Sequence, residues 1–432
     1  MNTQNNNIAA SAGNKAVNNK TEVLAGATTF LTMAYIIFVH PDILAAAGMD
    51  RSALIAVTCI AAGIASIATG LISKTPIAMA PGMGMNAYFA YSIVLGDKVA
   101  WPTALGIVFV AGVLFLLLTL IGIRQKLVDA IPRSLVFAIS VGIGLFITFM
   151  GLSKIGVVVS DPATLVTAGE LTPTVLIGLA GLLVMVVLEQ KNIRGSLLIG
   201  IIFATLLAVI FGYSKLPSTW VTLDIDISAT AFKLDILGAL KGGLFGSIFA
   251  LMFIDMFDSI GTVVACAHKA ELVDEHGRIQ KIDQLLGIDA AATILGSFLG
   301  TSPVTAYIES GAGIEQGGRT GRTAVTAGVL FLLSIIFIPV IGIVPGYATG
   351  PALVMVGLYM MREVTKIDFS RMDEAFPSFI IVVMIALSYS ISTGLAFGFI
   401  SFTLLKIATG KFRELHPAMW VIFVLSVIFF VV

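Results

Sequence analysis

Long apolar runs alternate with short polar segments along almost the whole chain. A helix that crosses a bilayer needs about 20 largely apolar residues, and fourteen runs approach that length. They lie at 22–39, 53–73, 77–95, 101–123, 133–152, 172–189, 195–213, 243–267, 285–301, 304–318, 322–344, 349–361, 375–391 and 393–409. This pattern predicts an all-α polytopic membrane protein with 14 transmembrane segments.

The polar stretch 213–242 divides the fourteen runs into two sets of seven. With an odd number of crossings, the second set enters the membrane from the opposite face, which is the inverted-repeat design of many secondary transporters. A shift of 227 residues places Gly84 on Gly311 and Thr28 on Asp255. We therefore expect 7+7 inverted repeats.

The distribution of basic residues predicts the orientation. Of the 25 Lys and Arg residues, six fall on one side of the predicted topology and the remaining 19 on the other. Cytoplasmic segments carry the excess of Lys and Arg, so the N-terminus is expected in the cytoplasm and the protein in the cell (plasma or inner) membrane. The six expected outside are Arg51, Lys98, Lys154, Lys215, Lys233 and Lys241.

The two ends of the chain differ in character. Residues 1–20 are polar and rich in Asn, which is typical of a disordered cytoplasmic tail. Residues 417–432 are apolar but only about 16 residues long, which is marginal for a crossing. This extra segment is expected either to lie on the membrane surface or to cross once more.

The third and tenth runs are corresponding members of the two sets, and both are interrupted. The run at 77–95 contains Pro81 and Gly82, and the run at 304–318 follows Pro303 and contains Gly311. Because Pro removes a backbone donor and Gly weakens a helix, each run is expected to be a short strand-like piece followed by a half-helix. Irregular backbone at membrane depth is tolerated where it lines a cavity, so the two breaks are expected to meet at a binding site.

Acidic residues lie inside the apolar runs. Asp255 and Asp258 stand near the middle of the run at 243–267, and their spacing of three residues places them on one helix face. Glu309 and Asn86 lie at the breaks of the tenth and third runs. An Asp at the centre of a membrane helix costs on the order of 2.5–3.5 kcal/mol on insertion scales, and such residues mark substrate or ion pathways.

Composition excludes several classes of function. The 432 residues are 58% hydrophobic and 12% charged, with a formal net charge of zero and a mean hydropathy of +1.02. The zero net charge leaves no basic patch for binding nucleic acid, and the only cysteines, Cys59 and Cys266, stand in apolar runs without disulfide or metal spacing. No nucleophile with a paired base stands in the runs. We expect no catalytic residues, no metal and no cofactor, and hence not an enzyme.

The predicted site favours a particular ligand chemistry. Carboxylates accept hydrogen bonds from N–H groups, and the amide of Asn86 both donates and accepts, which suits the edge of a nucleobase. Nearby aromatic residues such as Phe253 and Phe257 are able to stack on a planar ring. Burial favours proton uptake by Asp255, Asp258 or Glu309, so proton coupling is expected, with Na⁺ as the alternative.

At these residues the chain resembles the nucleobase cation symporter family, and within it the azaguanine-type (AzgA-like) purine permeases. The resemblance extends from about residue 21 to residue 412. It rests on TEVLAGATTFLTMAYIIFVHP, APGMGMNAYFAY, FIDMFDSIGT, and TSPVTAYIESGAGI followed by GGRTG.

The resemblance implies the uracil-permease fold and a two-domain organisation. Spans 1–4 (21–123) and 8–11 (243–344) would form a core domain, and spans 5–7 (133–213) and 12–14 (349–409) a gate domain. It also implies a homodimer formed through the gate domain and an elevator-like movement of the core.

The implied function is import of purine nucleobases (adenine, guanine or hypoxanthine) by proton symport. The alternatives are another nucleobase such as xanthine or uracil, an anion, or sodium coupling. Which of Asp255 and Asp258 contacts the base and which carries the proton stays open. The motifs place substrate binding at Asn86, Asp255, Asp258, Glu309, Gly84 and Thr28.

Overall fold

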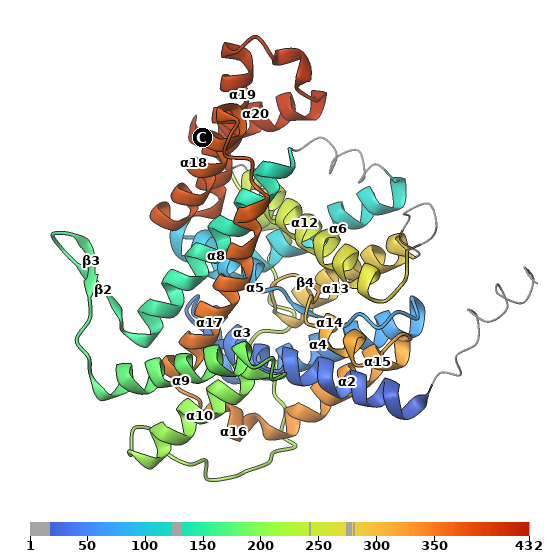
Figure 1. Cartoon of the computed structure of the whole chain (residues 1–432), viewed down its shortest axis with the longest axis vertical. Coiled ribbons are helices and arrows are strands. Elements are labelled where there is room, and N and C mark those ends of the chain that lie inside the picture. Colours follow the sequence, from blue (N-terminus) through green and yellow to red (C-terminus); the bar gives the residue numbers. More distant parts are fainter. Residues whose placement is uncertain (1–17, 123–131, 242, 274–278, 280, 432) are drawn as a thin grey trace, which may run out of the picture.

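The computed structural model describes residues 18–122, 132–241, 243–273, 279 and 281–431, and it is dominated by helices (Figure 1). The first half of the chain forms α2 (Asn19–Met33), α3 (Ile36–Ala45), α4 (Arg51–Ile72), β1 (Met79–Pro81), α5 (Met83–Ala87), the π-helix η1 (Tyr88–Gly96), α6 (Trp101–Ile121), α8 (Arg133–Ile155), β2 (Val158–Asp161), β3 (Leu165–Ala168), α9 (Pro173–Gln190) and α10 (Ser196–Ile210). The second half forms α11 (Ile236–Ala239), α12 (Phe245–Lys269), α13 (Ile282–Leu299), β4 (Val304–Ala306), α14 (Ser310–Glu315), α15 (Gly321–Ser334), η2 (Ile335–Phe337), α16 (Ile338–Gly342), α17 (Gly346–Met361), η3 (Arg362–Lys366), α18 (Met372–Ser388), α19 (Ile391–Ala408), η4 (Phe412–Glu414) and α20 (Pro417–Val431).

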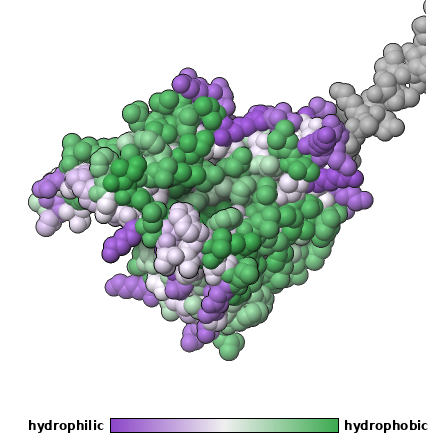
Figure 2. All heavy atoms as spheres, turned by 90° about the horizontal axis from the view of Figure 1, so that it is seen from below, coloured by the Kyte–Doolittle hydropathy of each residue, from purple (hydrophilic) through white to green (hydrophobic). Residues whose placement is uncertain are grey.

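Within the described ranges, nine helices are long and apolar enough to cross a membrane. Hydrophobic residues cover most of the face seen in Figure 2, and hydrophilic residues gather toward its margins. Helices of this length and composition are stable in lipid because each satisfies its own backbone hydrogen bonds. The chain is a multi-pass membrane protein, and the count of fourteen segments stays a prediction.

The first apolar run forms two consecutive helices, α2 and α3, over residues 19–45. The Asn18 side chain accepts a hydrogen bond from the Lys20 amide and caps α2, so Asn19 and Lys20 are helical although the sequence places them in the polar tail. The other tail residues, 1–17, lie outside the described residues. At its far end the helix continues through Pro41, beyond the predicted limit at residue 39.

The two interrupted runs meet at the centre of the fold. Strands β1 and β4 pair antiparallel, with Met79 opposite Ala306 and Pro81 opposite Val304. Every residue of both strands is buried. A three-residue strand cannot stand alone, and the pairing satisfies backbone groups that the helix breaks leave open. Because the strands are antiparallel, α5 follows from the Pro81 end of the pair and α14 from the Ala306 end.

Glycines bring two pairs of helices into backbone contact. A methyl group on Gly70 of α4 would lie 2.4 Å from the carbonyl oxygen of Gly321 at the start of α15. A methyl group on Gly151 of α8 would lie 2.7 Å from the carbonyl oxygen of Gly350 in α17. Small residues permit such close packing of membrane helices, so the backbones of α4 and α15, and those of α8 and α17, lie in close contact.

The helices divide into two packing groups. In one, α4 packs with α15 and α3, α2 with α14 and α15, and α6 with α12 and α13. In the other, α8 packs with α17 and α18, α9 with α10 and α17, and α18 with α19. Fewer contacts join the groups, among them those of α3 with α17, α5 with α8 and α12 with α19.

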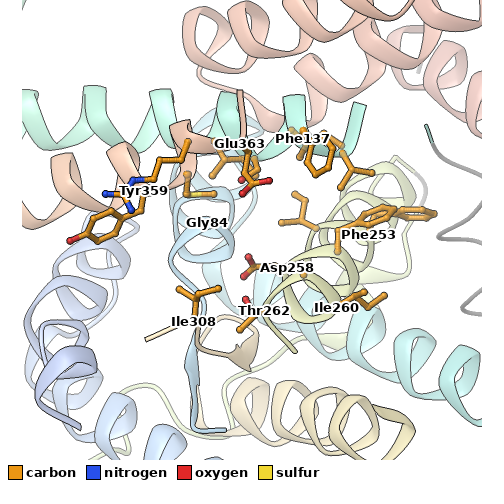
Figure 3. A pocket seen from close by; sticks show the side chains of 18 of the residues that line it. Gly84, Phe137, Phe253, Asp258, Ile260, Thr262, Ile308, Tyr359 and Glu363 are labelled. Atoms are coloured by element: carbon orange, nitrogen blue, oxygen red, sulfur yellow. The ribbon is translucent and has the colours of Figure 1, made fainter. Parts of the chain in front are cut away.

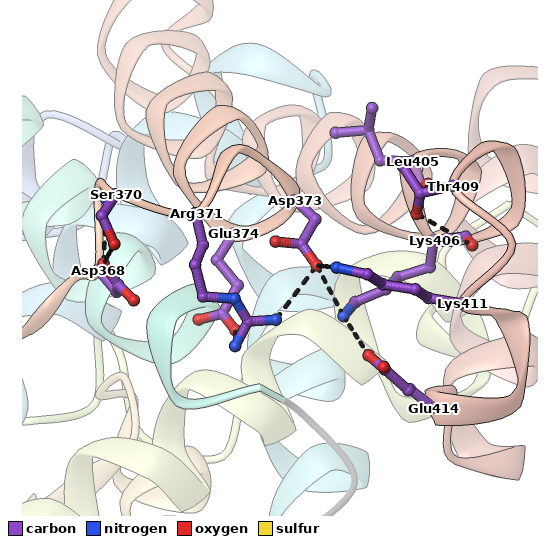
Figure 4. A network of polar contacts seen from close by, with 10 residues as sticks. All are labelled: Asp368, Ser370, Arg371, Asp373, Glu374, Leu405, Lys406, Thr409, Lys411 and Glu414. Carbon is purple, nitrogen blue, oxygen red and sulfur yellow. Dashed lines mark hydrogen bonds and ion pairs between the residues drawn. The ribbon is translucent and has the colours of Figure 1, made fainter.

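One ion cluster, named here the Asp373 cluster, joins α18 to α19 (Figure 4). The Asp373 carboxylate lies 2.9 Å from the Lys406 ammonium, and 3.2 Å from both Lys411 and Arg371. Lys406 also lies 2.7 Å from Glu414 in η4. Because Asp373 and Lys406 are both buried, each neutralises the other, and the cluster fixes one end of this helix pair.

A second ion cluster, named here the Asp42 cluster, crosses between the two packing groups. Asp42 of α3 lies 2.6 Å from Arg51 Nε and 3.8 Å from Lys154 Nζ of α8. The Thr349 hydroxyl of α17 donates to the same carboxylate at 2.7 Å. The cluster therefore ties α3 to α8 and α17.

Two peripheral elements complete the fold. An exposed β2–β3 hairpin follows α8, where the sequence predicts no strand. Its turn forms because Asp161 accepts hydrogen bonds from the amides of Ala163 and Thr164, each at 2.8 Å. The extra apolar segment forms α20, which packs on α19 with the rings of Phe397 and Phe430 4.8 Å apart.

Candidate substrate-binding site

A cavity of about 1970 Å³ extends along α12. Ser247 lines it near the start of this helix and Lys269 at its end, and residues of α8, α17 and α19 line the facing wall. The cavity therefore lies where the two packing groups meet. Close up, Asp258 stands in its middle, with Gly84 and Ile308 to one side and Phe253 to the other (Figure 3).

Helix α12 contributes a carboxylate and a row of aromatic rings to the cavity. The Asp258 side chain is exposed to the cavity, and it accepts no hydrogen bond from a described residue. Phe249, Phe253 and Phe257 follow one another at helical spacing, with ring centroids 4.3 Å and 5.9 Å apart. This face thus offers an anionic acceptor beside aromatic surface.

Glu309 enters the cavity at the break of the tenth run. It is the residue before α14, and its carboxylate accepts a hydrogen bond from the Tyr35 hydroxyl at 2.8 Å. Thr32 lies against the same place, with its hydroxyl 3.4 Å from the Glu309 carbonyl oxygen. All three residues line the cavity, so a second carboxylate faces the same space as Asp258.

Gly84 lines the cavity from α5. A methyl group at this position would lie 3.2 Å from Ile143 and 3.8 Å from Met360, which belong to the facing helices α8 and α17. Because Gly84 has no side chain, α5 lies close to the facing helices α8 and α17 at this point of the cavity wall.

Asn86 lies two residues beyond Gly84 and is fully buried rather than part of the cavity wall. Its side-chain oxygen accepts a hydrogen bond from Ser302. The Ser302 hydroxyl is 3.4 Å from His40 Nε2, and His40 Nδ1 is 2.7 Å from the Thr58 hydroxyl. Asn86 is therefore held in a network that joins the two interrupted runs to α3 and α4.

Asp255 and Asp258 occupy different environments, contrary to the expectation that they share one face. Asp255 is 2% exposed and does not line the cavity, and its Oδ2 lies 3.2 Å from the Thr293 hydroxyl of α13. Residues three apart are separated by about 60° around a helix. That angle is enough here to turn Asp255 toward α13 while Asp258 faces the cavity.

Thr28 does not line the cavity. Its hydroxyl donates to the Leu24 carbonyl oxygen of the same helix at 2.9 Å. The side chains that α2 and its connection to α3 place in the cavity are Thr32 and Tyr35, one and two turns further on. The structure thus brings together Asp258, Glu309 and Gly84 in the cavity wall. Asn86, Asp255 and Thr28 lie outside that wall.

Asp289 is a buried acidic residue that was not among the predicted site residues. This residue of α13 is fully buried, and its carboxylate accepts hydrogen bonds from the Ser259 hydroxyl at 2.6 Å and the Ala306 amide at 3.0 Å. It stands inside the apolar run at 285–301. The signal that singled out Asp255, an acidic residue within a predicted span, was therefore present here too.

The charges around the cavity are distributed unevenly. Among the described residues, no ion pair reaches Asp255, Asp258, Asp289 or Glu309. Basic side chains also line the cavity, and one of them, Lys269, is paired with Glu315 at 2.6 Å. The described part of the chain holds no group of three or more His, Cys, Asp or Glu residues suited to a metal ion.

Comparison with known proteins decides the family. The model of the Permease family matches residues 20–397. The chain belongs to this permease family. It is a membrane transporter and not an enzyme, and the resemblance drawn from its motifs is confirmed at the level of the family.

Relatives match over nearly their full length. The adenine permease AdeP of Escherichia coli is 42% identical over 417 residues, which cover 95% of this chain and 93% of AdeP. The guanine/hypoxanthine permease PbuO of Bacillus subtilis is 41% identical over 424 residues, covering 95% of this chain and 96% of PbuO.

Among solved structures, the transmembrane domain of the cyanobacterial bicarbonate transporter BicA is similar to this chain with a TM-score of 0.66. The sequences are 14% identical, and the match covers 88% of this chain and 98% of that domain. At this identity the likeness concerns the fold alone.

Proposed function

We propose that this permease imports purine nucleobases of the adenine, guanine and hypoxanthine class by proton symport. The observation that carries the proposal is the pair of carboxylates, Asp258 and Glu309, which face one cavity beside the rings of Phe253 and Phe257. Carboxylates accept hydrogen bonds from the N–H groups of a purine, and phenyl rings pack against its faces. The substrates named for AdeP and PbuO support the same class.

An anion is the alternative that the fold itself raises, because BicA is a bicarbonate transporter. Two carboxylates without a basic partner among the described residues disfavour an anion in the middle of this cavity. Other nucleobases are the remaining alternatives: xanthine carries one carbonyl group more than hypoxanthine, and uracil lacks the five-membered ring. Competition for uptake separates both from the proposed substrates.

Uptake of radiolabelled hypoxanthine into proteoliposomes tests the substrate. We expect unlabelled adenine, guanine or hypoxanthine to compete, and uracil, bicarbonate and sulfate to leave uptake unchanged. No uptake of labelled hypoxanthine, together with uptake of labelled bicarbonate, would contradict the proposal. Competition by uracil or xanthine alone would reassign the base.

The coupling ion is tested with the same preparation. We expect an inward proton gradient to drive accumulation, a protonophore to abolish it, and the external medium to become more alkaline as purine enters. Accumulation that follows a sodium gradient and ignores the protonophore would replace H⁺ by Na⁺.

We further propose that the chain folds as 7+7 inverted repeats. In the numbering of the predicted spans, the packed helices α4 and α15 are spans 2 and 11, and the packed helices α6 and α13 are spans 4 and 9. A shift of seven spans turns 2 into 9 and 11 into 4, so it maps the first pair onto the second. The same shift maps the α8–α17 pair, spans 5 and 12, onto itself. These packing partners support the repeat, and span mapping by single cysteine labelling in oriented membranes tests it, with the N-terminus expected in the cytoplasm.

Transport is proposed to follow an elevator mechanism. The core domain comprises 21–123 and 243–344 and moves against the gate domain of 133–213 and 349–409. The division into two packing groups supports it. We expect a disulfide between cysteines at Asp42 and Thr349, in a chain whose Cys59 and Cys266 are replaced by Ala, to block uptake until it is reduced. Unchanged uptake with the disulfide formed would argue against movement between the groups.

The gate domain is proposed to form the homodimer. Light scattering in detergent or nanodiscs is expected to give the mass of two 45.4 kDa chains. A monomeric mass in native-like lipid would remove the dimer from the proposal.

A further inference from the structure

A second polar cluster lies where α12 packs against α13 and β4, outside the cavity lining. It consists of Asp255 and Ser259 on α12, Asp289 and Thr293 on α13, and Thr305 on β4, and it is named here the rear cluster. Its members are at most 2% exposed, and none of them lines the cavity. The rear cluster is therefore separate from the space in which Asp258 and Glu309 face a substrate.

When Asp255 is ionised, the Thr293 hydroxyl faces more hydrogen-bond acceptors than it has hydrogens to donate. The Thr293 hydroxyl oxygen lies 3.2 Å from Asp255 Oδ2 and 3.1 Å from the Val304 carbonyl oxygen, and it also accepts from the Val304 amide at 3.2 Å. A hydroxyl has one hydrogen to donate. Two acceptors therefore face a single hydrogen, and one contact lacks a donor.

Around Asp289, by contrast, each acceptor has a hydrogen-bond donor. Its two oxygens accept from the Ser259 hydroxyl and the Ala306 amide, and the Thr305 hydroxyl, 2.7 Å from the Ser259 oxygen, is free to donate to it. Each of these contacts has its own hydrogen. The hydrogen bonds around Asp289 therefore suit an ionised carboxylate, whereas those around Asp255 suit a protonated carboxylic acid.

The second oxygen of Asp255 also indicates that this side chain is protonated. Asp255 Oδ1 is buried and has no hydrogen-bond partner among the described residues. An ionised carboxylate without partners is strongly destabilised in such a place, and a neutral one far less so. Both oxygens of Asp255 therefore indicate a bound proton: the contact at Oδ2 lacks a hydrogen, and Oδ1 lacks a partner that would stabilise a charge.

Few charges surround Asp255. Of the elements that pack on α12, α5, α6, β4 and α20 carry no titratable side chain, whereas α13 contributes Asp289 and Asp283. α14 contributes Glu315, paired with Lys269 at the end of α12, and α19 contributes Lys406, which is held in the Asp373 cluster. The carboxylates that act electrostatically on Asp255 are Asp289 and Asp258.

We propose that the rear cluster is the binding site of the coupling proton, with the proton on Asp255 and Asp289 as the fixed anion beside it. Asp255 Oδ2–H donates to the Thr293 oxygen, and the Thr293 hydroxyl donates to the Val304 carbonyl. No bond between heavy atoms changes, and the proton alone enters and leaves. The inference rests on the proposed symport, and it divides the two Asp residues of α12 into a proton carrier and a substrate contact.

The rear cluster is connected to the substrate site through β4. Thr293 binds both backbone groups of Val304, and Asp289 binds the amide of Ala306. Three residues beyond Ala306, the chain places Glu309 in the cavity. Loss of the proton leaves Thr293 with two acceptors, so it weakens the hold on β4 and thereby on the residues that position Glu309.

The experiment compares two modes of transport in proteoliposomes. Accumulation driven by an inward gradient of one pH unit requires the proton, whereas counterflow of labelled against unlabelled hypoxanthine requires no net proton movement. With one proton per base, the wild type is expected to accumulate substrate up to about tenfold, since a factor of ten corresponds to about 1.4 kcal/mol.

The decisive variants are Asp255→Asn and Thr293→Val, with Thr293→Ser as the matched control that keeps the hydroxyl. We expect Asp255→Asn and Thr293→Val to lose gradient-driven accumulation, with a final ratio near one, while counterflow continues. Thr293→Ser is expected to accumulate like the wild type. A sodium gradient is expected to drive none of them.

The remaining outcomes overturn the proposal in distinguishable ways. Accumulation by Asp255→Asn driven by the proton gradient removes Asp255 as the carrier. If that variant does not fold, the nearly isosteric Thr293→Val decides, and unchanged accumulation by it rejects the rear cluster. Sodium-driven accumulation by the wild type rejects a proton site, and a wild type that carries no purine rejects the proposed function and this inference with it.

Discussion

Carboxylates of two kinds lie inside this membrane protein. The Asp42 and Asp373 carboxylates are each surrounded by basic side chains, and their nearest basic nitrogen atoms lie at 2.6 Å and 2.9 Å. Around Asp255, Asp258, Asp289 and Glu309, no described basic residue forms an ion pair. The first kind joins helices near the ends of the bundle, and the second surrounds the paired strands β1 and β4.

The difference between these regions separates structural from functional charge. A buried ion pair is neutral as a unit, and its removal costs stability because one partner is left uncompensated. A buried carboxylate without a cation is stabilised by hydrogen-bond donors, as Asp289 is, or it needs a ligand or a proton. The need for a ligand or a proton makes a carboxylate responsive to substrate and to pH. Substitutions in the two regions are therefore expected to affect different measurements.

The largest effect is expected from Asp258→Asn in the cavity. The change keeps the shape of the side chain and removes the negative acceptor, and a hydrogen bond to a charged group contributes about 1.5–3 kcal/mol. Hypoxanthine uptake is expected to fall about 100-fold, while the melting temperature in detergent stays within the error of the wild type. Normal uptake with lowered stability would place Asp258 with the structural carboxylates.

The next effect is expected from Asp373→Asn. It leaves the buried Lys406 with Glu414 as its remaining described ion-pair partner, and we expect a loss of about 2 kcal/mol of stability. Thermal unfolding in detergent measures this loss, and uptake per folded molecule is expected to match the wild type. A selective loss of uptake at normal stability would show that Asp373 belongs with the functional carboxylates rather than the structural ones.

A smaller effect is expected from Asp42→Asn, because Arg51 keeps its hydrogen bonds to the carbonyl oxygens of Gly342 and Val344. We expect a loss of about 1 kcal/mol together with a moderate change in uptake, since the cluster crosses between the two packing groups. Thr349→Val removes one hydrogen bond to the same carboxylate and serves as the milder companion. Equal effects of both changes on uptake and none on stability would make the cluster a part of the transport movement alone.

The smallest effect concerns pH and the exposed Glu414. The hydrogen bond from Lys406 lowers the pKa of Glu414. A lowered pKa in the folded protein contributes stability above the unfolded value of about 4.3, and that stability is lost as the pH falls through the folded value. We expect the melting temperature of the wild type to approach that of Glu414→Gln when the pH is lowered from 6 to 3, and a constant difference would exclude this ion pair as the cause.

The sequence predicts the elements well where lipid and chain chemistry act locally. Apolar runs identify α4, α6, α8 and α12 because every turn of a membrane helix meets a hydrophobic environment. Pro81, Gly82 and Gly311 indicate the breaks because they act on their own backbone. The β2–β3 hairpin was missed because its turn depends on the single side chain of Asp161, which hydropathy does not register.

Predictions within the site were less complete because they depend on the directions of side chains. Asp258 and Glu309 face the cavity as expected of binding residues. Thr28 turns back to its own helix, Asn86 lies in a buried network, and Asp289 was overlooked although it, too, is an acidic residue in an apolar run.

The sequence alone determined that this protein crosses the membrane many times, that two of its runs are interrupted, and that acidic residues lie at membrane depth, because each of these depends on a residue and its near neighbours. The tertiary structure alone decided which acidic residue faces the cavity and which faces α13. A rotation of about 60° around one helix separates Asp255 from Asp258. Which neighbour each meets depends on helices that lie far away in the sequence.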